Sequence, residues 1–245
     1  MASRILRGGL ARARRLRRFG PARLRMGYRA VPASRVYGFD RGLPVDRWYI
    51  EDFLTRFAPV GGYASGTIGG RVLEIGGREY ADRFVTGAGG APPQVDVLHA
   101  DSSNPEATIV GDLTDPGVLE EGAYDCIICT QTLQVIWDVP AALGQLHRAL
   151  RPGGALLVTV PGISAAMTPD RDHWGDWWRF TSGSVRRLAE EAFPGGDIRV
   201  EAYGNLLAAT CFLHGLAVEE LTQGELELRD PAYEVIVALR ATKAG

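Results

Sequence analysis

Arg71-Val-Leu-Glu-Ile-Gly-Gly77 is the stretch on which the fold of this chain depends. It is a short apolar run that carries one acid and ends in two glycines, and the helix-like segment Glu79-Tyr-Ala-Asp-Arg-Phe84 follows it. In open α/β sheets, a buried strand that passes through a glycine turn into a helix presents backbone N–H groups to a cofactor. Many strands end in two glycines, so this interpretation depends on companion residues further along the chain.

The chain after this stretch alternates between strand patterns and helical patterns. The expected strands are residues 72–75, 95–99, 107–110, 124–129, 155–160, 198–203 and 233–239, and helices are expected at residues 78–85 and 206–216 and in the intervals before and after the fifth strand. Strands that alternate with helices predict a parallel sheet with helices on both faces. The predicted fold class is therefore α/β, a Rossmann-like sheet of seven mostly parallel strands, and the sequence leaves the direction of the last strand open.

Three regions are expected along the 245 residues. Residues 1–35 form a basic, flexible arm, residues 36–69 form an N-terminal loop and helix that cover the site, and residues 70–245 form the α/β domain. Asp46 is expected to cap the helix of the second region. The apolar residues of that helix share one face, namely Ile50, Phe53, Leu54 and Phe57.

The arm is strongly basic in a chain whose net charge is −2, since residues 1–39 contain eleven arginines and no acid. We expect a solvated leader. Peripheral contact with an anionic membrane and an organelle transit peptide are the alternatives, and no specific nucleic-acid partner is expected. No stretch approaches the roughly 18 to 20 apolar residues of a membrane span. A cytoplasmic location is expected if the protein is bacterial, and the sequence does not indicate an oligomeric state.

Cys126 and Cys129 form a C-x-x-C motif inside the expected strand 124–129. Residues three apart on a strand point to opposite faces, so this pair cannot chelate one metal ion. We expect both to be core cysteines, and we expect no metal site.

Polar residues stand where four of the expected strands end. They are Glu74, Asp101, Asp112 and Gln131. Because ligands of open α/β sheets bind outside the carboxyl ends of the strands, these side chains are predicted to converge on one crevice.

Four motifs make residues 70–240 resemble a class I S-adenosylmethionine-dependent methyltransferase. They are Val72-Leu-Glu-Ile-Gly76, Gly111-Asp-Leu113, Tyr124-Asp125 and Leu150-Arg-Pro-Gly-Gly-Ala-Leu-Leu157. With the segments Asp46–Glu51 and Trp178–Thr181, the chain is similar to bacterial methyltransferases linked to surface-polysaccharide or glycosyltransferase pathways. The resemblance implies S-adenosyl-L-methionine as the cofactor and a small-molecule or glycan acceptor, with O-methylation of a sugar hydroxyl as the expected reaction.

The resemblance also implies roles for the loop after the first strand. Gly76 would let the backbone approach the methionine portion of the cofactor, and Glu74 would fix this loop or the cofactor's amino group. The family pattern is acid-x-Gly-x-Gly-x-Gly, and the chain departs from it because Arg78 and Tyr80 occupy the later glycine positions.

The resemblance also implies roles for the residues at the other strand ends. Asp101 would accept hydrogen bonds from both ribose hydroxyls, and Asp112 would accept one from the adenine amine, with the Leu113 backbone alongside. Gln131 would line the crevice near the transferred methyl group.

The segment Asp170–Phe180 supplies the candidate catalytic residues. A hydroxyl acceptor benefits from a general base, and His173 and Asp176 are the candidates for it. A surface or packing role for His173 is equally compatible with the sequence. The tryptophans of this segment form either a stacking platform for a sugar or a lid on the core. The candidate acceptor-binding residues are Asp46, Arg47, Tyr49, Trp178 and Arg179.

Two other classes of function stay open at this point. A non-catalytic, methyltransferase-like domain that binds a partner is compatible with the altered glycine pattern. An NAD-dependent sugar-modifying enzyme needs G-x-G-x-x-G after its first strand, which Gly76-Gly77 does not supply.

Overall fold

The computed structural model describes residues 30–58, 70–85, 93–166 and 171–245. Most of the basic arm expected over residues 1–35 lies outside the described residues, and so does the end of the segment 36–69. Within the described ranges, no helix combines the length and the apolar character needed to cross a membrane. The same ranges contain no group of three or more His, Cys, Asp or Glu side chains placed to hold a metal ion.

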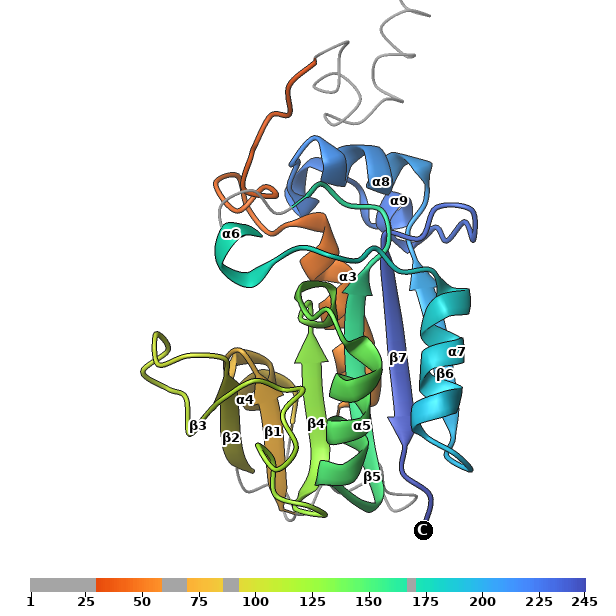
Figure 1. The fold of residues 1–245 in the computed structure, drawn as a ribbon. Helices are drawn as coiled ribbons and strands as arrows, with labels where there is room; N and C mark the ends of the chain where they lie inside the picture. The colour runs from red at the N-terminus through yellow and green to blue at the C-terminus, as the bar shows by residue number, and fades with distance from the viewer. Residues whose placement is uncertain (1–29, 59–69, 86–92, 167–170) are drawn as a thin grey trace, which may run out of the picture.

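A seven-stranded sheet forms the centre of the molecule, with the strand order β3-β2-β1-β4-β5-β7-β6 (Figure 1). Its strands are β1 (Arg71–Ile75), β2 (Gln94–His99), β3 (Ile109–Val110), β4 (Tyr124–Thr130), β5 (Leu150–Pro161), β6 (Ile198–Tyr203) and β7 (Ile236–Thr242). The first five strands pair in parallel, whereas β7 runs antiparallel between β5 and β6. The predicted seven-stranded, mostly parallel α/β sheet is confirmed.

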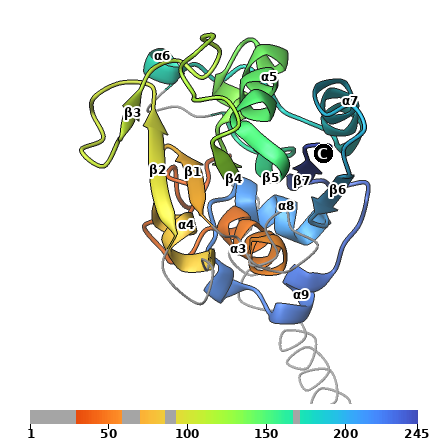
Figure 2. The same cartoon turned by 90° about the horizontal axis from the view of Figure 1, so that it is seen from below.

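Helices cover both faces of this sheet (Figure 2). α5 and α7 lie on one face, and α3, α4 and α8 lie on the other. The helical elements are α3 (Val45–Phe57), α4 (Glu79–Phe84), η2 (Leu133–Val135), α5 (Val139–Ala149), α6 (Arg171–Trp174), α7 (Ser182–Ala192), α8 (Leu206–Leu213), η3 (Val218–Glu220) and α9 (Gln223–Glu227). Each face has its own apolar core, because successive strand residues point to opposite sides.

The two cysteines of the C-x-x-C motif illustrate this alternation. Cys126 packs in the core that contains α3, and Cys129 packs in the core that contains α5 and α7. Both thiols are free and buried, and burial raises the pKa of each to about 12. The prediction of core cysteines on opposite faces is confirmed.

Three strands begin at least two residues away from the sequence prediction. β3 begins two residues late, at Ile109. β5 begins early, because Leu150 already pairs with Tyr124, and the register shifts before Cys126 pairs with Ala155, which makes residues 151–154 a bulge inside the strand. β7 begins three residues later than expected. The reason is that the Tyr233 N–H donates to the carbonyl of Asp230 in a turn, which keeps residue 233 out of the sheet.

The helix starts give one confirmation and one correction. Thr181 caps α7, where its hydroxyl accepts from the Ser184 N–H and the Ser184 hydroxyl accepts from the Thr181 N–H. Asp46 was expected to cap its helix, and this expectation is wrong. α3 begins one residue earlier, at Val45 after Pro44, so Asp46 lies within the first turn with its side chain buried.

Candidate active site

Two cavities lie at the carboxyl ends of β1, β4 and β5, the upper edge of the sheet in Figure 1. The larger, which we call the cofactor cavity, has a volume of about 630 Å³. It is lined by Ile75, Gly76, Leu98, His99, Ala100, Gly111, Asp112, Leu113, Thr114, Gln131, Thr132, Val135, Ile136, Trp137, Asp138, His173 and Trp174. The ends of β1, β2, β3 and β4 therefore meet at one cavity, as predicted from the strand-end positions.

Gly76 occupies the end of β1 in a left-handed conformation, with φ of 92°. Its N–H donates to the carbonyl of Leu98 at 2.8 Å, and its own carbonyl accepts from Asn104 Nδ2 at 2.9 Å. A Cβ at this position would meet no heavy atom within 4 Å, so the open side of the glycine is free for a ligand. The backbone here can be approached closely, which is the role that the sequence resemblance implies for Gly76.

The departure from the family's glycine pattern falls outside this cavity. Arg78 has φ of −129°, which any residue can adopt, and it pairs with Asp82 on the surface. Tyr80 lies within α4 and is buried. Neither position has a positive φ, and neither side chain lines the cofactor cavity.

Glu74 does not line the cofactor cavity either, although it was a candidate cofactor-binding residue. Its buried carboxylate accepts hydrogen bonds from the backbone N–H of Ala81 at 2.6 Å and of Tyr80 at 3.3 Å. Burial outweighs these hydrogen bonds and raises the pKa of Glu74 to about 6. Glu74 therefore fixes the start of α4, which matches the loop-fixing half of its expected role.

Asp112 and Leu113 line the cofactor cavity beyond β3. The exposed Asp112 carboxylate accepts from the N–H and the hydroxyl of Thr114, which fixes its orientation. Leu113 is 4% exposed and turns its side chain into the core. A fixed, accessible carboxylate beside apolar side chains suits an aromatic ring that carries an amine.

Asp101 lies beside the cofactor cavity rather than in its lining. Its carboxylate accepts from the N–H of Ser103 at 2.9 Å and contacts Nε2 of His173 and Nδ1 of His99, each at 3.2 Å. Hydrogen bonds from Ser103, supported by His173, lower the pKa of Asp101 to about 2. Asp101 thus links the loop after β2 to α6, whose His173 and Trp174 border the cavity.

A smaller chamber of about 140 Å³ adjoins this site, and we call it the polar chamber. It is lined by Tyr37, Phe39, Asp46, Arg47, Gln131, Gln134, Pro161, Ser164, Ala165, Asp176, Arg179 and Phe212. Three of the five predicted acceptor-binding residues, namely Asp46, Arg47 and Arg179, therefore lie together. Gln131 lines both cavities and stands at the boundary between them.

The two candidate catalytic residues are in different places. His173 borders the cofactor cavity with an exposed side chain, whereas Asp176 lines the polar chamber and is 3% exposed. The guanidinium of Arg179 donates to both carboxylate oxygens of Asp176, at 2.6 and 2.9 Å. Arg179, a candidate acceptor-binding residue, is therefore paired with a carboxylate three residues away.

The remaining two predicted acceptor-binding residues line neither cavity. Tyr49 is fully buried between Trp48 and Tyr203 in the core beneath α3. Trp178 stacks on Trp137 with ring centroids 5.2 Å apart, and its Nε1–H donates to the carbonyl of Ile136. Tyr49 therefore belongs to the core on the α3 side of the sheet, and Trp178 belongs to the outer surface.

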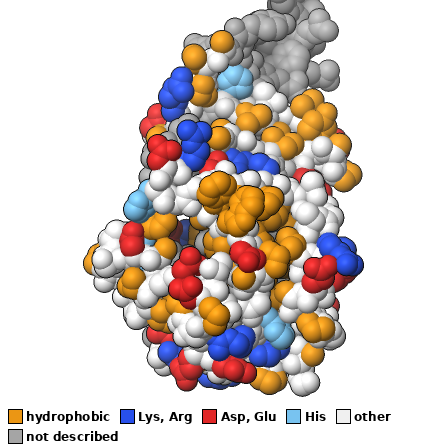
Figure 3. Space-filling view, in the orientation of Figure 1, with side chains coloured by type: hydrophobic (Ala, Val, Ile, Leu, Met, Phe, Trp, Pro, Cys, Tyr) orange, Lys and Arg blue, Asp and Glu red, His pale blue; other side chains and the backbone are white. Residues whose placement is uncertain are grey.

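An exposed aromatic cluster stands beside the cofactor cavity, and one of its members, Trp137, also lines that cavity. Figure 3 shows hydrophobic side chains gathered at the centre of this face, above the loop that follows β4. Trp137, Trp177 and Trp178 are 67%, 54% and 37% exposed, and their rings contact one another. This arrangement is closer to an open platform than to a lid packed on the core.

Sequence reasoning missed Gln134, Thr114 and Trp137. Gln134 Nε2 donates to the carbonyl of Gln131 at 2.7 Å, and the carbonyl of Gln134 accepts from the N–H groups of Trp177 and Trp178. The one available signal was the position of Gln134 just after a strand end, three residues beyond Gln131. For Trp137 the sequence carried no comparable signal.

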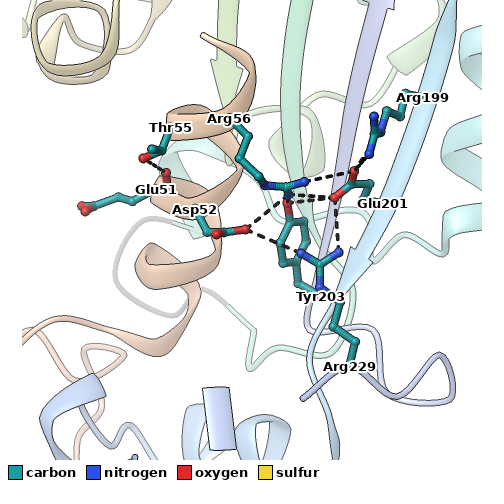
Figure 4. Close-up of polar contacts among 8 residues, drawn as sticks. All are labelled: Glu51, Asp52, Thr55, Arg56, Arg199, Glu201, Tyr203 and Arg229. Carbon is teal, nitrogen blue, oxygen red and sulfur yellow. Dashed lines mark hydrogen bonds and ion pairs between the residues drawn. The ribbon is translucent and has the colours of Figure 1, made fainter. Parts of the chain in front are cut away.

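Helix α3, which brings Asp46 and Arg47 to the chamber, is held to β6 by an ionic network (Figure 4). The carboxylate of Glu201 on β6 forms ion pairs with the guanidinium groups of Arg56 at 2.7 Å, Arg199 at 2.8 Å and Arg229 at 3.3 Å. Tyr203 also contacts Arg56. Burial opposes the charge of Glu201, but these arginines lower its pKa to about 2. The far end of α3 is thereby fixed to the sheet.

Comparison with known proteins identifies the family. Residues 46–190, more than half of the chain, match the family model described as a methyltransferase domain. The chain belongs to this methyltransferase family. This membership supports an enzymatic role with S-adenosylmethionine as the cofactor, which the sequence resemblance implies.

Two solved structures show the same fold. Phosphoethanolamine N-methyltransferase 2 of Haemonchus contortus, in complex with S-adenosyl-L-methionine, is 17% identical with a TM-score of 0.53, covering 89% of this chain and 55% of that one. An S-adenosylmethionine-dependent methyltransferase of Mesorhizobium loti is 14% identical with a TM-score of 0.50, covering 81% and 98%. This chain thus spans about half the length of the Haemonchus enzyme.

A curated protein also matches over a short segment. "Probable polyketide synthase 10" of Dictyostelium discoideum is 29% identical over 69 residues, which are 28% of this chain and 3% of that protein.

The cofactor cavity fits the cofactor of this family. Its volume lies in the range of roughly 300 to 1,000 Å³ that small-molecule sites occupy. Gly76 has no side chain, so its backbone can lie against the ligand. The oriented carboxylate of Asp112 can accept a hydrogen bond from an amine. Leu98, Val135 and Ile136 form an apolar wall that suits a ring.

Proposed function

We propose that this protein transfers a methyl group from S-adenosylmethionine to a hydroxyl of a small, sugar-like acceptor. The observation that carries the proposal is the pair of adjoining cavities that share Gln131. One is large, and the other is small and combines charged and amide side chains with the rings of Tyr37, Phe39 and Phe212. A cofactor and an acceptor placed on the two sides of Gln131 would face each other across it.

The cofactor, when bound, supplies an electrophilic methyl group on a sulfonium, so the protein mainly has to position the reactants. Gly76 would lie against the methionine portion, and Asp112 with Leu113 would hold the adenine. Asp101 borders this cavity and remains our candidate for the ribose hydroxyls, which it would reach by exchanging its contact with His173.

The acceptor side comprises Asp46, Arg47, Gln131, Gln134 and Arg179. His173 remains a candidate base at the border of the cofactor cavity. Both oxygens of Asp176 accept from Arg179, which favours a role for Asp176 in shaping the chamber over one in taking a proton. The aromatic cluster beside the cofactor cavity favours an acceptor with a sugar ring or another flat portion that stacks against tryptophan.

The cofactor site is tested by calorimetry with S-adenosylhomocysteine. Asp112→Ala removes an oriented carboxylate from the cavity, and we expect affinity to fall at least 30-fold. That factor corresponds to about 2 kcal/mol, typical of a hydrogen bond to a charged group. Asp115→Ala changes an exposed carboxylate in the same loop and should leave affinity unchanged.

Three outcomes of the binding and turnover experiments decide between the candidate functions. No binding by the wild type at millimolar ligand would contradict the proposal. Cofactor binding together with methylation of a glycan or polyol panel would support it. Cofactor binding without methylation of any acceptor would favour a binding domain built on the methyltransferase fold.

A further inference from the structure

The polar chamber contains buried polar atoms that have no hydrogen-bond partner among the described residues. They are Asp46 Oδ1, Gln131 Nε2 and Gln134 Oε1. Leaving a buried polar group unpaired destabilises a fold, and native structures contain only a few such groups per hundred residues. Three in one chamber of about 140 Å³ therefore indicate a ligand that pairs with them.

These three atoms belong to side chains whose positions are set by other contacts. Gln134 donates through Nε2 to the carbonyl of Gln131, and its Oε1 has no hydrogen-bond partner among the described residues. The N–H of Gln131 donates to the carbonyl of Thr159 at 2.8 Å on the neighbouring strand. Asp46 is part of α3, which the Glu201 network fixes to β6. The chamber is therefore preorganised, and a ligand would not have to order it.

The charges around the chamber balance. Asp46 and Asp176 contribute two carboxylates, and Arg47 and Arg179 contribute two guanidinium groups. A charged ligand gains no net attraction from such a set. The open atoms comprise two that accept hydrogen bonds when Asp46 is ionised and one that donates. A group that both donates and accepts fits this combination, and a hydroxyl does so.

We infer that the polar chamber binds a neutral, hydroxyl-bearing part of the methyl acceptor, and that Asp46 receives the proton of the methylated hydroxyl. This inference rests on the proposed function. The acceptor oxygen forms its bond to the methyl carbon as the carbon–sulfur bond breaks, and the electron pair of that bond stays on sulfur. The O–H proton moves to the Asp46 carboxylate, which later releases it to solvent.

The surroundings of Asp46 suit this role. Burial raises the pKa of its carboxyl, and Arg47 on the same helix opposes the rise. The other ionisable groups that face it are Tyr80 on α4 and the Asp176–Arg179 pair across the chamber. A carboxylate whose pKa lies nearer to neutrality is a better proton acceptor than one in water.

Binding is tested on protein saturated with S-adenosylhomocysteine, titrated with myo-inositol and methyl α-glucopyranoside as neutral probes and with phosphocholine and succinate as charged probes. We expect only the neutral probes to bind. Asp46→Ala should weaken them at least 10-fold without changing the affinity for S-adenosylhomocysteine. Asp52→Ala is the matched control. Its carboxylate lies outside the chamber and pairs with Arg56 and Arg229, so this variant reports the effect of a weaker α3 anchor alone.

The outcomes separate the two proposals. Failure of the wild type to bind S-adenosylhomocysteine defeats the proposed function itself. Normal S-adenosylhomocysteine binding with no neutral probe bound, with only charged probes bound, or with Asp46→Ala behaving as the wild type overturns the inference about the chamber alone.

Proton transfer is tested by turnover, measured as S-adenosylhomocysteine release with the neutral probe that binds most tightly. Asp46→Asn keeps the shape of the side chain and should lower kcat at least 100-fold, in line with the loss of a general base. We expect kcat of the wild type to rise with pH as Asp46 loses its proton, and Asp46→Asn should abolish that rise. A kcat within threefold of the wild type, or an unchanged pH profile, would overturn the role of Asp46. Asp52→Asn is the control here too.

Discussion

Two carboxylates near the two ends of helix α3 lie in opposite environments. At its C-terminal half, Arg56 meets Glu201, which two further arginines also contact, and the pKa of Glu201 falls to about 2. At its first turn, Asp46 is more deeply buried, its Oδ1 has no partner among the described residues, and its pKa rises. The Glu201 carboxylate is fully paired within the protein, and this complete arrangement stabilises the fold. The Asp46 carboxylate forms an incomplete arrangement, because it lacks a partner that a ligand would supply.

The largest expected effect on stability comes from breaking the complete arrangement. Glu201→Gln removes the charge that three arginines share, and we expect the free energy of unfolding at pH 7.5 to fall by about 2 kcal/mol, after allowance for solvent screening at this partly exposed site. Because the folded pKa of Glu201 lies below the usual 4.5, its contribution is present above pH 4.5 and is lost as the pH falls toward 2. Urea denaturation at several pH values measures it.

The control is Glu190→Gln on the exposed face of α7, which should leave stability unchanged. Equal stability of the Glu201→Gln variant and the wild type at pH 7.5 would show that the network contributes nothing to folding.

The incomplete arrangement should respond in the opposite direction. Asp46→Asn removes a buried, partly unpaired charge, so we expect the free energy of unfolding at pH 7.5 to rise by about 1 kcal/mol. The folded pKa of Asp46 is raised, so the stability that protonation provides is full below pH 3.8 and is lost as the pH rises through the folded pKa. The gain in the variant should therefore vanish below about pH 3.8. A destabilised variant would mean that Asp46 is paired within the fold and is not waiting for a ligand.

The smallest effect concerns a residue that belongs to neither arrangement. Arg78→Gly restores one of the two glycines that the family pattern has and this chain lacks, and we expect the dissociation constant of S-adenosylhomocysteine to change by less than twofold. Arg78 already has an ordinary φ and does not line the cofactor cavity. A tenfold gain in affinity by calorimetry would show that the altered loop weakens the site.

The sequence predicted the sheet and its ligand-binding edge because strand periodicity and strand-end acids are local signals. It could not predict that Glu74 turns back to the N–H groups of α4 while Asp112 lines the cavity, since both are acids near strand ends. The sequence also could not predict that Asp46 and Gln131 line one polar chamber. These two residues are 85 positions apart and meet only through the packing of α3 on the sheet.

The reversed direction of β7 has a practical consequence for handling the protein. Ile236 at the start of β7 pairs with Pro161, which lines the polar chamber, and Thr242 near its end pairs with Ala155 at the opposite edge of the sheet. The last residue, Gly245, therefore emerges on the side away from both cavities (Figure 1). Immobilising the chain on a sensor surface through this end would leave the cofactor cavity and the polar chamber open to solution.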